Sequence, residues 1–339
     1  MENIGGNAIV IRQVNENLVR KVLKEKELAT KRQIAEATGL SIVTVGTVLQ
    51  HLMRKNEVRE IGVAASSGGR PARQYKYNLD YALALILFPV EREGSIYIHT
   101  TVVNLAGDCV HETDVKVEHI NLFSFEQIID KSIHEFPSIE AIGFGLPGAE
   151  FEGKMIVSDY KDLLGMEVAE HFRNRYQKPI TIENDVNAAV IGFANRMQLA
   201  ADSSIVYLFF PERFPPGAGI YLNGQLYKGR RNFAGEVANI PLGINWIETS
   251  LLTTFDLLCD AISKLTVAIS SVLNPDSVVL YGNFLNQGHI NAVIQKSKAQ
   301  LPQSVLPTIL LSDNFEADYL QGMIVQTLST LTPNLQLTK

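Results

Sequence analysis

Residues 141–148 have the sequence AIGFGLPG, and residues 179–185 have the sequence PITIEND. In each, a short apolar run ends in a loop of glycine or polar residues, as at a buried strand that leads into a loop at the edge of a sheet. A third run, SIVYLFF at 204–210, is followed by GAG at 217–219. Such runs alternate with helical stretches from Tyr81 onward, which predicts an α/β fold with its sheets covered by helices. Ligands of such folds collect at the carboxyl ends of strands, so we expect a binding site at these loops.

The charges of the chain are segregated. Residues 1–78 hold 13 Lys and Arg against 7 Asp and Glu, whereas the remaining residues hold 17 against 29. A basic head on an acidic body places any contact with a polyanion in the head, because an acidic surface repels phosphate. The chain has 339 residues, 46% of them hydrophobic, which is enough for more than one core. We predict two domains, residues 1–78 and residues 79–339.

Bulk features exclude several classes of protein. No run of about eighteen apolar residues is present, and the start of the sequence lacks the basic-then-apolar layout of a signal peptide. We therefore expect a cytoplasmic protein that does not enter a membrane. The two cysteines, Cys109 and Cys259, are too few and too far apart to indicate a disulfide framework or a thiolate metal site.

Two short helices are expected in the basic head. Residues 31–38 follow Thr30, which can cap a helix, and precede Gly39, which permits the left-handed turn that ends one. Ser41 can cap a second helix over residues 42–55. Two short helices joined through a glycine turn predict a helix-turn-helix.

The surrounding sequence extends this motif to an N-terminal winged helix-turn-helix. An amphipathic helix is expected over residues 11–26, and two strands, over residues 58–61 and 73–77, flank a glycine-rich tip that forms the wing. The second helix of the motif opens with small uncharged side chains, and we expect it to contact base edges in the major groove through Ser41, Val43, Thr44 and Thr47. We expect Arg70 at the tip to enter the minor groove and Arg73 to contact phosphate. The alternative is a winged helix that contacts protein.

Several motifs follow one another in a characteristic order. They are GRPA at 69–72, GFGLPG at 143–148, END at 183–185, GRRNFAGE at 229–236 and LNPDSVVLYG at 273–282. Together they resemble the ROK family, named for repressors, open reading frames and kinases, whose kinases adopt the actin-like ATPase fold. The resemblance covers nearly the whole chain. It implies a two-lobed, sugar-kinase-like domain behind the winged head.

The resemblance also implies a sugar site. In the family's kinases, the aspartate of the END motif is the general base on a sugar hydroxyl, which corresponds to Asp185. The residues that hold other hydroxyls correspond to Asn184 and Glu236, and Asn239 occupies the position of a histidine that helps to hold sugar. The alternative is a structural function, in which Asp185 caps a helix that begins near Val186.

Three departures from the family argue against kinase chemistry. The position of the first phosphate loop is occupied by FPVERE at 88–93, which offers no glycine turn. The second phosphate loop corresponds to residues 212–219, where Pro215 and Pro216 have no N–H to donate. The family's zinc-binding histidine is replaced by Asn239, and no cysteine follows before Cys259, so we expect neither a metal nor another cofactor.

These observations predict a DNA-binding transcriptional regulator, a repressor of carbohydrate-utilisation genes. We expect it to bind double-stranded operator DNA as a homodimer or dimer of dimers and to respond to a sugar or phosphosugar. One alternative is a regulator that responds to a protein partner, which predicts that side chains fill the cleft at Asp185. The other is an active sugar kinase, which requires turnover of ATP.

Overall fold

The computed structural model describes residues 4–63, 72–158 and 160–331. The chain forms two compact units, the first built from Met1–Leu83 and Asn104–Asp108, the second from Ala84–Val103 and Cys109–Leu331. In the described part of the chain, no helix combines the length and apolar character needed to cross a membrane.

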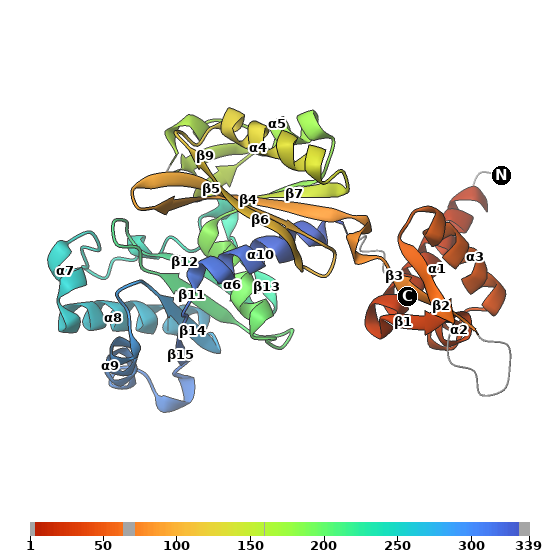
Figure 1. Cartoon of the computed structure of the whole chain (residues 1–339). Coiled ribbons are helices and arrows are strands. Elements are labelled where there is room, and N and C mark those ends of the chain that lie inside the picture. Colours follow the sequence, from red (N-terminus) through yellow and green to blue (C-terminus); the bar gives the residue numbers. More distant parts are fainter. Residues whose placement is uncertain (1–3, 64–71, 159, 332–339) are drawn as a thin grey trace. The chain divides into compact units, whose positions relative to one another are not determined.

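The first unit consists of three helices and a small antiparallel sheet (Figure 1). Its elements are α1 (Ile4–Lys26), β1 (Leu28–Thr30), α2 (Lys31–Thr38), α3 (Ile42–Arg54), β2 (Val58–Val63) and β3 (Arg73–Tyr77). The strand order is β1-β3-β2. Leu23, Ile34, Leu49 and Tyr75 are buried together between the helices and the sheet.

Local hydrogen bonds explain why α2 and α3 begin and end where they do. The Thr30 side chain accepts from the N–H of Gln33, whose own side chain accepts from the Thr30 N–H, and Gly39 ends α2 with a φ of 72°. The Ser41 hydroxyl accepts from the N–H of Thr44 at 3.0 Å. Both predicted helices are confirmed, but α1 begins earlier than its periodicity predicted, and β1 was not predicted.

The second unit contains two five-stranded sheets. The first sheet has the order β10-β7-β4-β5-β6 and the second has the order β13-β12-β11-β14-β15. The first sheet consists of β4 (Leu83–Arg92), β5 (Ser95–Val103), β6 (Cys109–Val117), β7 (Ile139–Gly145) and β10 (Ile180–Glu183). The second consists of β11 (Ile205–Phe209), β12 (Gly217–Leu222), β13 (Gln225–Leu226), β14 (Ser277–Tyr281) and β15 (Thr308–Leu311). Each sheet begins with three consecutive antiparallel strands and adds two later strands beside the first, so the two sheets repeat one topology.

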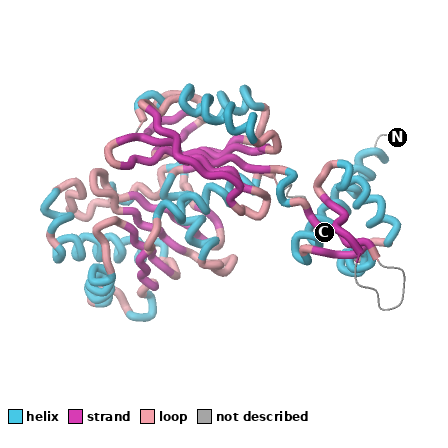
Figure 2. Tube along the Cα trace, in the orientation of Figure 1, coloured by secondary structure: helices cyan, strands magenta, loops and turns pink. Residues whose placement is uncertain are grey.

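Helices cover the outer face of each sheet, as the α/β pattern predicted (Figures 1 and 2). On the first sheet lie α4 (Leu122–Glu135) and α5 (Val168–Tyr176), whose Phe125 and Phe172 pack against Phe144 of β7. On the second lie α7 (Thr249–Thr253), α8 (Phe255–Leu273) and α9 (Gln287–Lys298). A short hairpin of β8 (Gly148–Phe151) and β9 (Lys154–Ser158) follows β7.

Two helices, α6 (Asp185–Arg196) and α10 (Phe315–Ser329), lie between the sheets (Figure 1). Helix α6 follows a strand of the first sheet and packs on β11 and β12 of the second, while α10 follows the second sheet and packs on β7 and β10 of the first. The two helices cross in backbone contact, because a Cβ on Gly192 would overlap the Asp318 carbonyl oxygen and one on Gly322 would overlap that of Ala188. The contact between α6 and α10 thereby holds the two sheets together.

Candidate functional site

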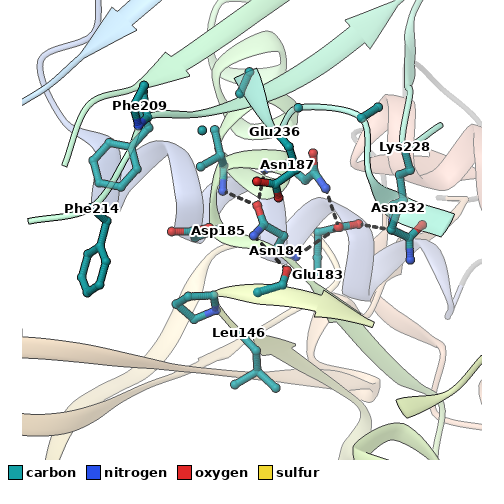
Figure 3. A pocket seen from close by; sticks show the side chains of 18 of the residues that line it. Leu146, Glu183, Asn184, Asp185, Asn187, Phe209, Phe214, Lys228, Asn232 and Glu236 are labelled. Carbon is teal, nitrogen blue, oxygen red and sulfur yellow. Dashed lines mark hydrogen bonds and ion pairs between the residues drawn. The ribbon is translucent and has the colours of Figure 1, made fainter. Parts of the chain in front are cut away.

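A cavity of about 420 Å³ opens between the two sheets of the second unit, at the ends of their strands (Figure 3). Most of its wall comes from segments 146–148, 182–187, 211–218 and 228–238. Strands β7 and β10 run parallel, and Glu183 at the end of β10 is paired with Gly145 at the end of β7. The loops of residues 146–148 and 184–187 therefore meet at one edge, as the sequence predicted.

Asn184 has a structural function at the floor of the cavity. Its side-chain oxygen accepts from the N–H groups of Val186 at 3.0 Å and Asn187 at 3.3 Å, which caps α6. Its amide nitrogen donates to the carbonyl oxygen of Gly148 at 3.1 Å, which fixes the neighbouring loop. The alternative that Asp185 is the cap is thus wrong, because Asp185 is the first residue within the helix.

Glu183 is a buried carboxylate with four donors around it. Lys228 lies 2.7 Å from Oε2, and Gln326 of α10 donates to the same oxygen at 2.9 Å. Oε1 accepts from Asn187 at 3.3 Å and from the N–H of Asn184 at 3.1 Å. A buried charge is tolerated only when it is paired in this way. Glu183 therefore holds the 228–238 segment to the floor of the cavity.

Asp185, Asn187 and Glu236 give the cavity its polar side (Figure 3). Asp185 is half-buried and Glu236 is exposed. A carboxylate accepts hydrogen bonds from two hydroxyls, and an amide supplies both a donor and an acceptor. This side can therefore bind a ligand that presents several hydroxyl groups.

The opposite side of the cavity is apolar. Phe209 and Phe214 lie there together, away from Glu183 and Glu236 and on the side toward which the Asp185 carboxylate points (Figure 3). Pro215 and Pro216 follow Phe214 in the cavity wall. Phe214 is 57% exposed, so its ring is accessible from solvent. A cavity with one polar and one apolar side suits a ligand with hydroxyl edges and an apolar face.

The structure brings together three of the four residues proposed for sugar contact. Asn184, Asp185 and Glu236 line the cavity, whereas Asn239, at the end of the short helix η4 (Val237–Asn239), is not among the lining residues. The sequence analysis did not select Asn187, Lys228 and Asn232, which also line it. Asn187 lies in the polar run that begins with the END motif, which was a usable signal.

Of the residues proposed to contact DNA, Val43, Thr44 and Thr47 lie on α3, Ser41 caps that helix, and Arg73 begins β3. Val43 is 79% exposed and Thr47 is also exposed, while the hydroxyls of Ser41 and Thr44 bond each other at 2.8 Å. Arg73 forms an exposed ion pair with Glu60 at 2.9 Å. Arg70 lies outside the described residues.

Gln50 is a further exposed residue of α3 that the sequence analysis did not select. It is exposed and lies on the same stripe of α3 as Val43 and Thr47, at positions i, i+4 and i+7. Helical periodicity alone would have identified it. Its amide is long enough for the bidentate contact with adenine that glutamine makes in major grooves.

Comparison with known proteins identifies the domain that holds the cavity. The model of the ROK family matches residues 92–249. The chain carries a ROK family domain. The xylose repressor of Caldicellulosiruptor bescii is 26% identical over 249 residues, which are 70% of this chain and 61% of that protein. The xylose repressor of Bacillus subtilis is 24% identical over 84% of this chain and 74% of its own length. The regulator NagC of Escherichia coli is 23% identical over 70% of this chain and 60% of its own length.

Solved structures of ROK proteins share the fold. A ROK family transcriptional regulator described as a homolog of the E. coli MLC protein aligns with a TM-score of 0.66, at 15% identity, over 95% of this chain and all of its own. The ROK hexokinase of Thermus thermophilus aligns with a TM-score of 0.58, at 17% identity, over 74% of this chain and 99% of its own. The α/β architecture is thus that of ROK regulators and of ROK sugar kinases.

The ROK domain of this chain differs from the family's kinases where their first phosphate loop would begin. Strand β4 continues through Phe88 to Arg92, and the Phe88 side chain is fully buried. Its ring packs against His99 at 4.7 Å and Tyr319 at 4.6 Å between ring centroids. A backbone that is paired in a strand has no N–H groups to direct at phosphate.

The residues that would hold the family's zinc do not fit a metal site here. Asn239 stands at the histidine position, and amide side chains are not typical zinc ligands. Over the described ranges, the structure contains no group of three or more His, Cys, Asp and Glu side chains placed to bind a metal.

Proposed function

We propose that this protein is a DNA-binding transcriptional regulator whose ROK domain senses a sugar. The observation that carries the proposal is the open cavity at Asp185, which has both a hydroxyl-binding side and an apolar side. A regulator that responds only to a protein partner predicted a cleft filled by side chains, and a cavity of about 420 Å³ favours the sugar instead.

The first unit is proposed to be a winged helix-turn-helix that binds operator DNA. Helices α2 and α3 pack through Ile34 and Leu49 and leave Val43, Thr47 and Gln50 facing solvent. The β2–β3 hairpin stands where a wing is expected, and the excess of Lys and Arg in residues 1–78 supports contact with phosphate. The relatives named as repressors support the same function.

The ROK domain is proposed not to transfer phosphate. Aromatic rings lie in the three strands that, by the family resemblance, lead to the nucleotide loops of the kinases: Phe88 within β4, Phe209 at the end of β11 and Tyr281 at the end of β14. The last two pack with Phe315 at 4.3 and 5.5 Å between centroids, and Phe88 packs with Tyr319. Pro215 and Pro216 supply no N–H donors. ATP hydrolysis with any sugar would contradict this part of the proposal.

Regulation requires that the sugar bind one conformation better than another. We propose that two heads of a homodimer bind an inverted repeat and that the sugar changes their spacing by closing the cavity. Coupling free energies of about 1 to 3 kcal/mol are typical of such switches and change affinity roughly 5- to 150-fold.

Sugar binding is tested first, by thermal unfolding of the full chain in the presence of different ligands. The ligands are D-xylose, D-glucose, N-acetyl-D-glucosamine, glucose 6-phosphate, N-acetylglucosamine 6-phosphate and ATP. A ligand of the native state raises the unfolding midpoint by mass action. We expect a rise with at least one sugar and none with ATP. Asp185→Asn should abolish the rise, whereas Glu248→Gln, which changes a carboxylate outside the cavity wall, should preserve it.

The DNA is tested by selection of duplexes from a random library with the full chain. We expect an inverted repeat to be recovered and the active sugar to change its affinity. A sugar that binds without changing operator affinity would contradict the proposed switch but not the proposed function as a repressor. If no sugar shifts the midpoint, the regulator that responds to a protein partner is favoured.

A further inference from the structure

The two phenylalanines on the apolar side of the cavity are held in place by their surroundings. Phe209 ends β11, and its ring stacks on Phe315 of α10 at 4.3 Å between centroids, with 13° between the ring planes. Phe214 lies in the loop that follows β11 and is succeeded at once by Pro215 and Pro216. Proline fixes φ, which limits the conformations of this loop. The apolar side is therefore formed before a ligand arrives, which lowers the cost of binding one.

The ring of Phe214 is covered far less than that of Phe209. It is 57% exposed, and within the described ranges no other aromatic ring packs against it. Phe209, by contrast, is half-buried against Phe315. A ligand that covers an exposed apolar ring in a cavity wall gains free energy, because that surface leaves water. A ligand that reaches Phe214 is thus favoured over one that stops short of it.

The hydroxyl-binding groups lie in a different part of the cavity from the two phenylalanines. Figure 3 shows Phe209 and Phe214 at one end, Lys228 at the other, and Glu236 between them, with the Asp185 carboxylate pointing toward the phenylalanines. The cavity volume of about 420 Å³ falls within the range of roughly 300–1,000 Å³ in which proteins enclose drug-sized ligands. A single pyranose is smaller than such a ligand. One ring held by the polar groups therefore leaves room at the apolar end.

The charge of the cavity wall favours a neutral ligand. Of the described residues that line it, Glu183, Asp185 and Glu236 are acidic and Lys228 is basic. Lys228 lies 2.7 Å from Glu183, so its charge is already paired. The remaining carboxylates repel a phosphate group but accept hydrogen bonds from hydroxyls. A phosphosugar is therefore disfavoured.

We infer that the ligand of this cavity is a neutral disaccharide. One sugar ring binds through its hydroxyls to Asp185, Asn187 and Glu236, and the second ring packs one face on Phe214 and Phe209. A pyranose with equatorial hydroxyls presents C–H groups on its faces, and these leave water when they pack on an aromatic ring. The inference rests on the proposed sugar function and names the class of sugar that the ROK domain senses.

The test is isothermal titration calorimetry of the full chain with sugars and their dimers. D-xylose is compared with xylobiose, D-glucose with cellobiose and maltose, and N-acetyl-D-glucosamine with chitobiose. We expect at least one disaccharide to bind roughly 3- to 10-fold more tightly than its monosaccharide, which is what contact with an aromatic ring contributes. Glucose 6-phosphate should bind no more tightly than glucose.

The ratio of disaccharide to monosaccharide affinity identifies the contact with Phe214. Phe214→Ala should bring this ratio close to one, and it should unfold near the wild-type midpoint because the ring is largely exposed. Phe123→Ala removes a 64% exposed ring of α4 that lies outside the cavity wall, and it should keep the wild-type ratio. Asp185→Asn should weaken the binding of both ligands.

Each other outcome has a distinct meaning. Monosaccharides that bind as tightly as their dimers overturn the inference and leave the sugar sensor intact, and so does a Phe214→Ala variant that keeps the wild-type ratio. Phenyl β-D-glucoside that binds more tightly than every disaccharide would identify an aromatic glycoside as the ligand and overturn the disaccharide. Tighter binding of glucose 6-phosphate than of glucose would overturn the neutral ligand. If the wild type binds none of these compounds, the proposed sugar function itself fails.

Discussion

Glu183, Asp185 and Asp318 are carboxylates of the ROK domain that differ in their surroundings. Glu183 and Asp318 are buried and surrounded by donors, so their carboxylates stabilise the fold. Asp185 is half-buried and lines the cavity. Only the last can exchange its contacts for those of a ligand without exposing a buried charge.

Asp318 should be the most costly single carboxylate to remove. Its side chain is fully buried, Arg196 donates to Oδ1 at 2.8 and 2.7 Å, and Tyr207 and Ser312 donate to Oδ2. Removing this carboxylate leaves the buried hydroxyls of Tyr207 and Ser312 without their acceptor, which costs about 1–3 kcal/mol for each unsatisfied group. Asp318→Ala should lower the free energy of unfolding by the sum of these two costs in urea. Asp313→Ala, at a 90% exposed carboxylate 4.0 Å from the same arginine, should change it by less than about 0.5 kcal/mol.

His289 should make the stability of the second unit depend on pH. Burial lowers the pKa of His289 from its ordinary value of 6.5, and its Nδ1 accepts from the Asn286 N–H at the start of α9. A lowered pKa means that the folded state favours the neutral ring. The contribution of His289 to the free energy of unfolding is therefore complete above its unfolded-state pKa and is lost as the pH falls through its folded-state pKa.

The measurement is the unfolding midpoint of the second unit between about pH 7 and about pH 5. It should fall more steeply for wild type than for His289→Gln, which keeps a residue able to form the same cap but has no titratable ring. Parallel pH profiles for the two proteins would show that this ring does not contribute.

At the scale of elements, the crossing of α6 and α10 requires glycine. The packing of α3 against its neighbours does not. A Cβ at Gly322 would overlap the Ala188 carbonyl oxygen of α6. A Cβ at Gly46 in α3 would meet only the Lys31 ammonium nitrogen, at 3.7 Å. The same substitution should therefore have opposite effects at the two positions.

Gly322→Ala should lower the unfolding midpoint of the second unit, because overpacking costs about 1–3 kcal/mol. Gly46→Ala should stabilise the first unit by up to about 1 kcal/mol, the difference in helix propensity. Calorimetry of the full chain can follow both units in one scan. A stabilising Gly322→Ala would mean that the two helices do not cross in backbone contact.

At the scale of the whole molecule, charge is divided between the two units. The excess of Lys and Arg in residues 1–78, beside an acidic remainder, predicts that affinity for duplex DNA falls steeply as salt is added. Arg73→Gln should reduce the slope of log affinity against log salt by about 1. Lys178→Gln, a matched loss of one positive charge in the ROK domain, should leave the slope unchanged.

The sequence by itself determined what short-range chemistry controls. The helix boundaries at Thr30, Gly39 and Ser41 follow from hydrogen bonds between residues at most four apart, so the local sequence was sufficient to predict them. The alternation of apolar runs with helical stretches likewise gave the α/β class. The convergence of the 146–148 and 184–187 loops followed from strand polarity alone.

Only the tertiary structure decided which polar residues face the cavity and which hold the fold. Asn184 rather than Asp185 caps α6, because its oxygen reaches two N–H groups, while Asn239 does not line the wall at all. Arg196 and Tyr207 meet Asp318 across 122 and 111 residues of sequence, and Tyr319 reaches Gly145 from the end of the chain. Such contacts depend on the crossing of two helices in three dimensions, which no local pattern of residues encodes.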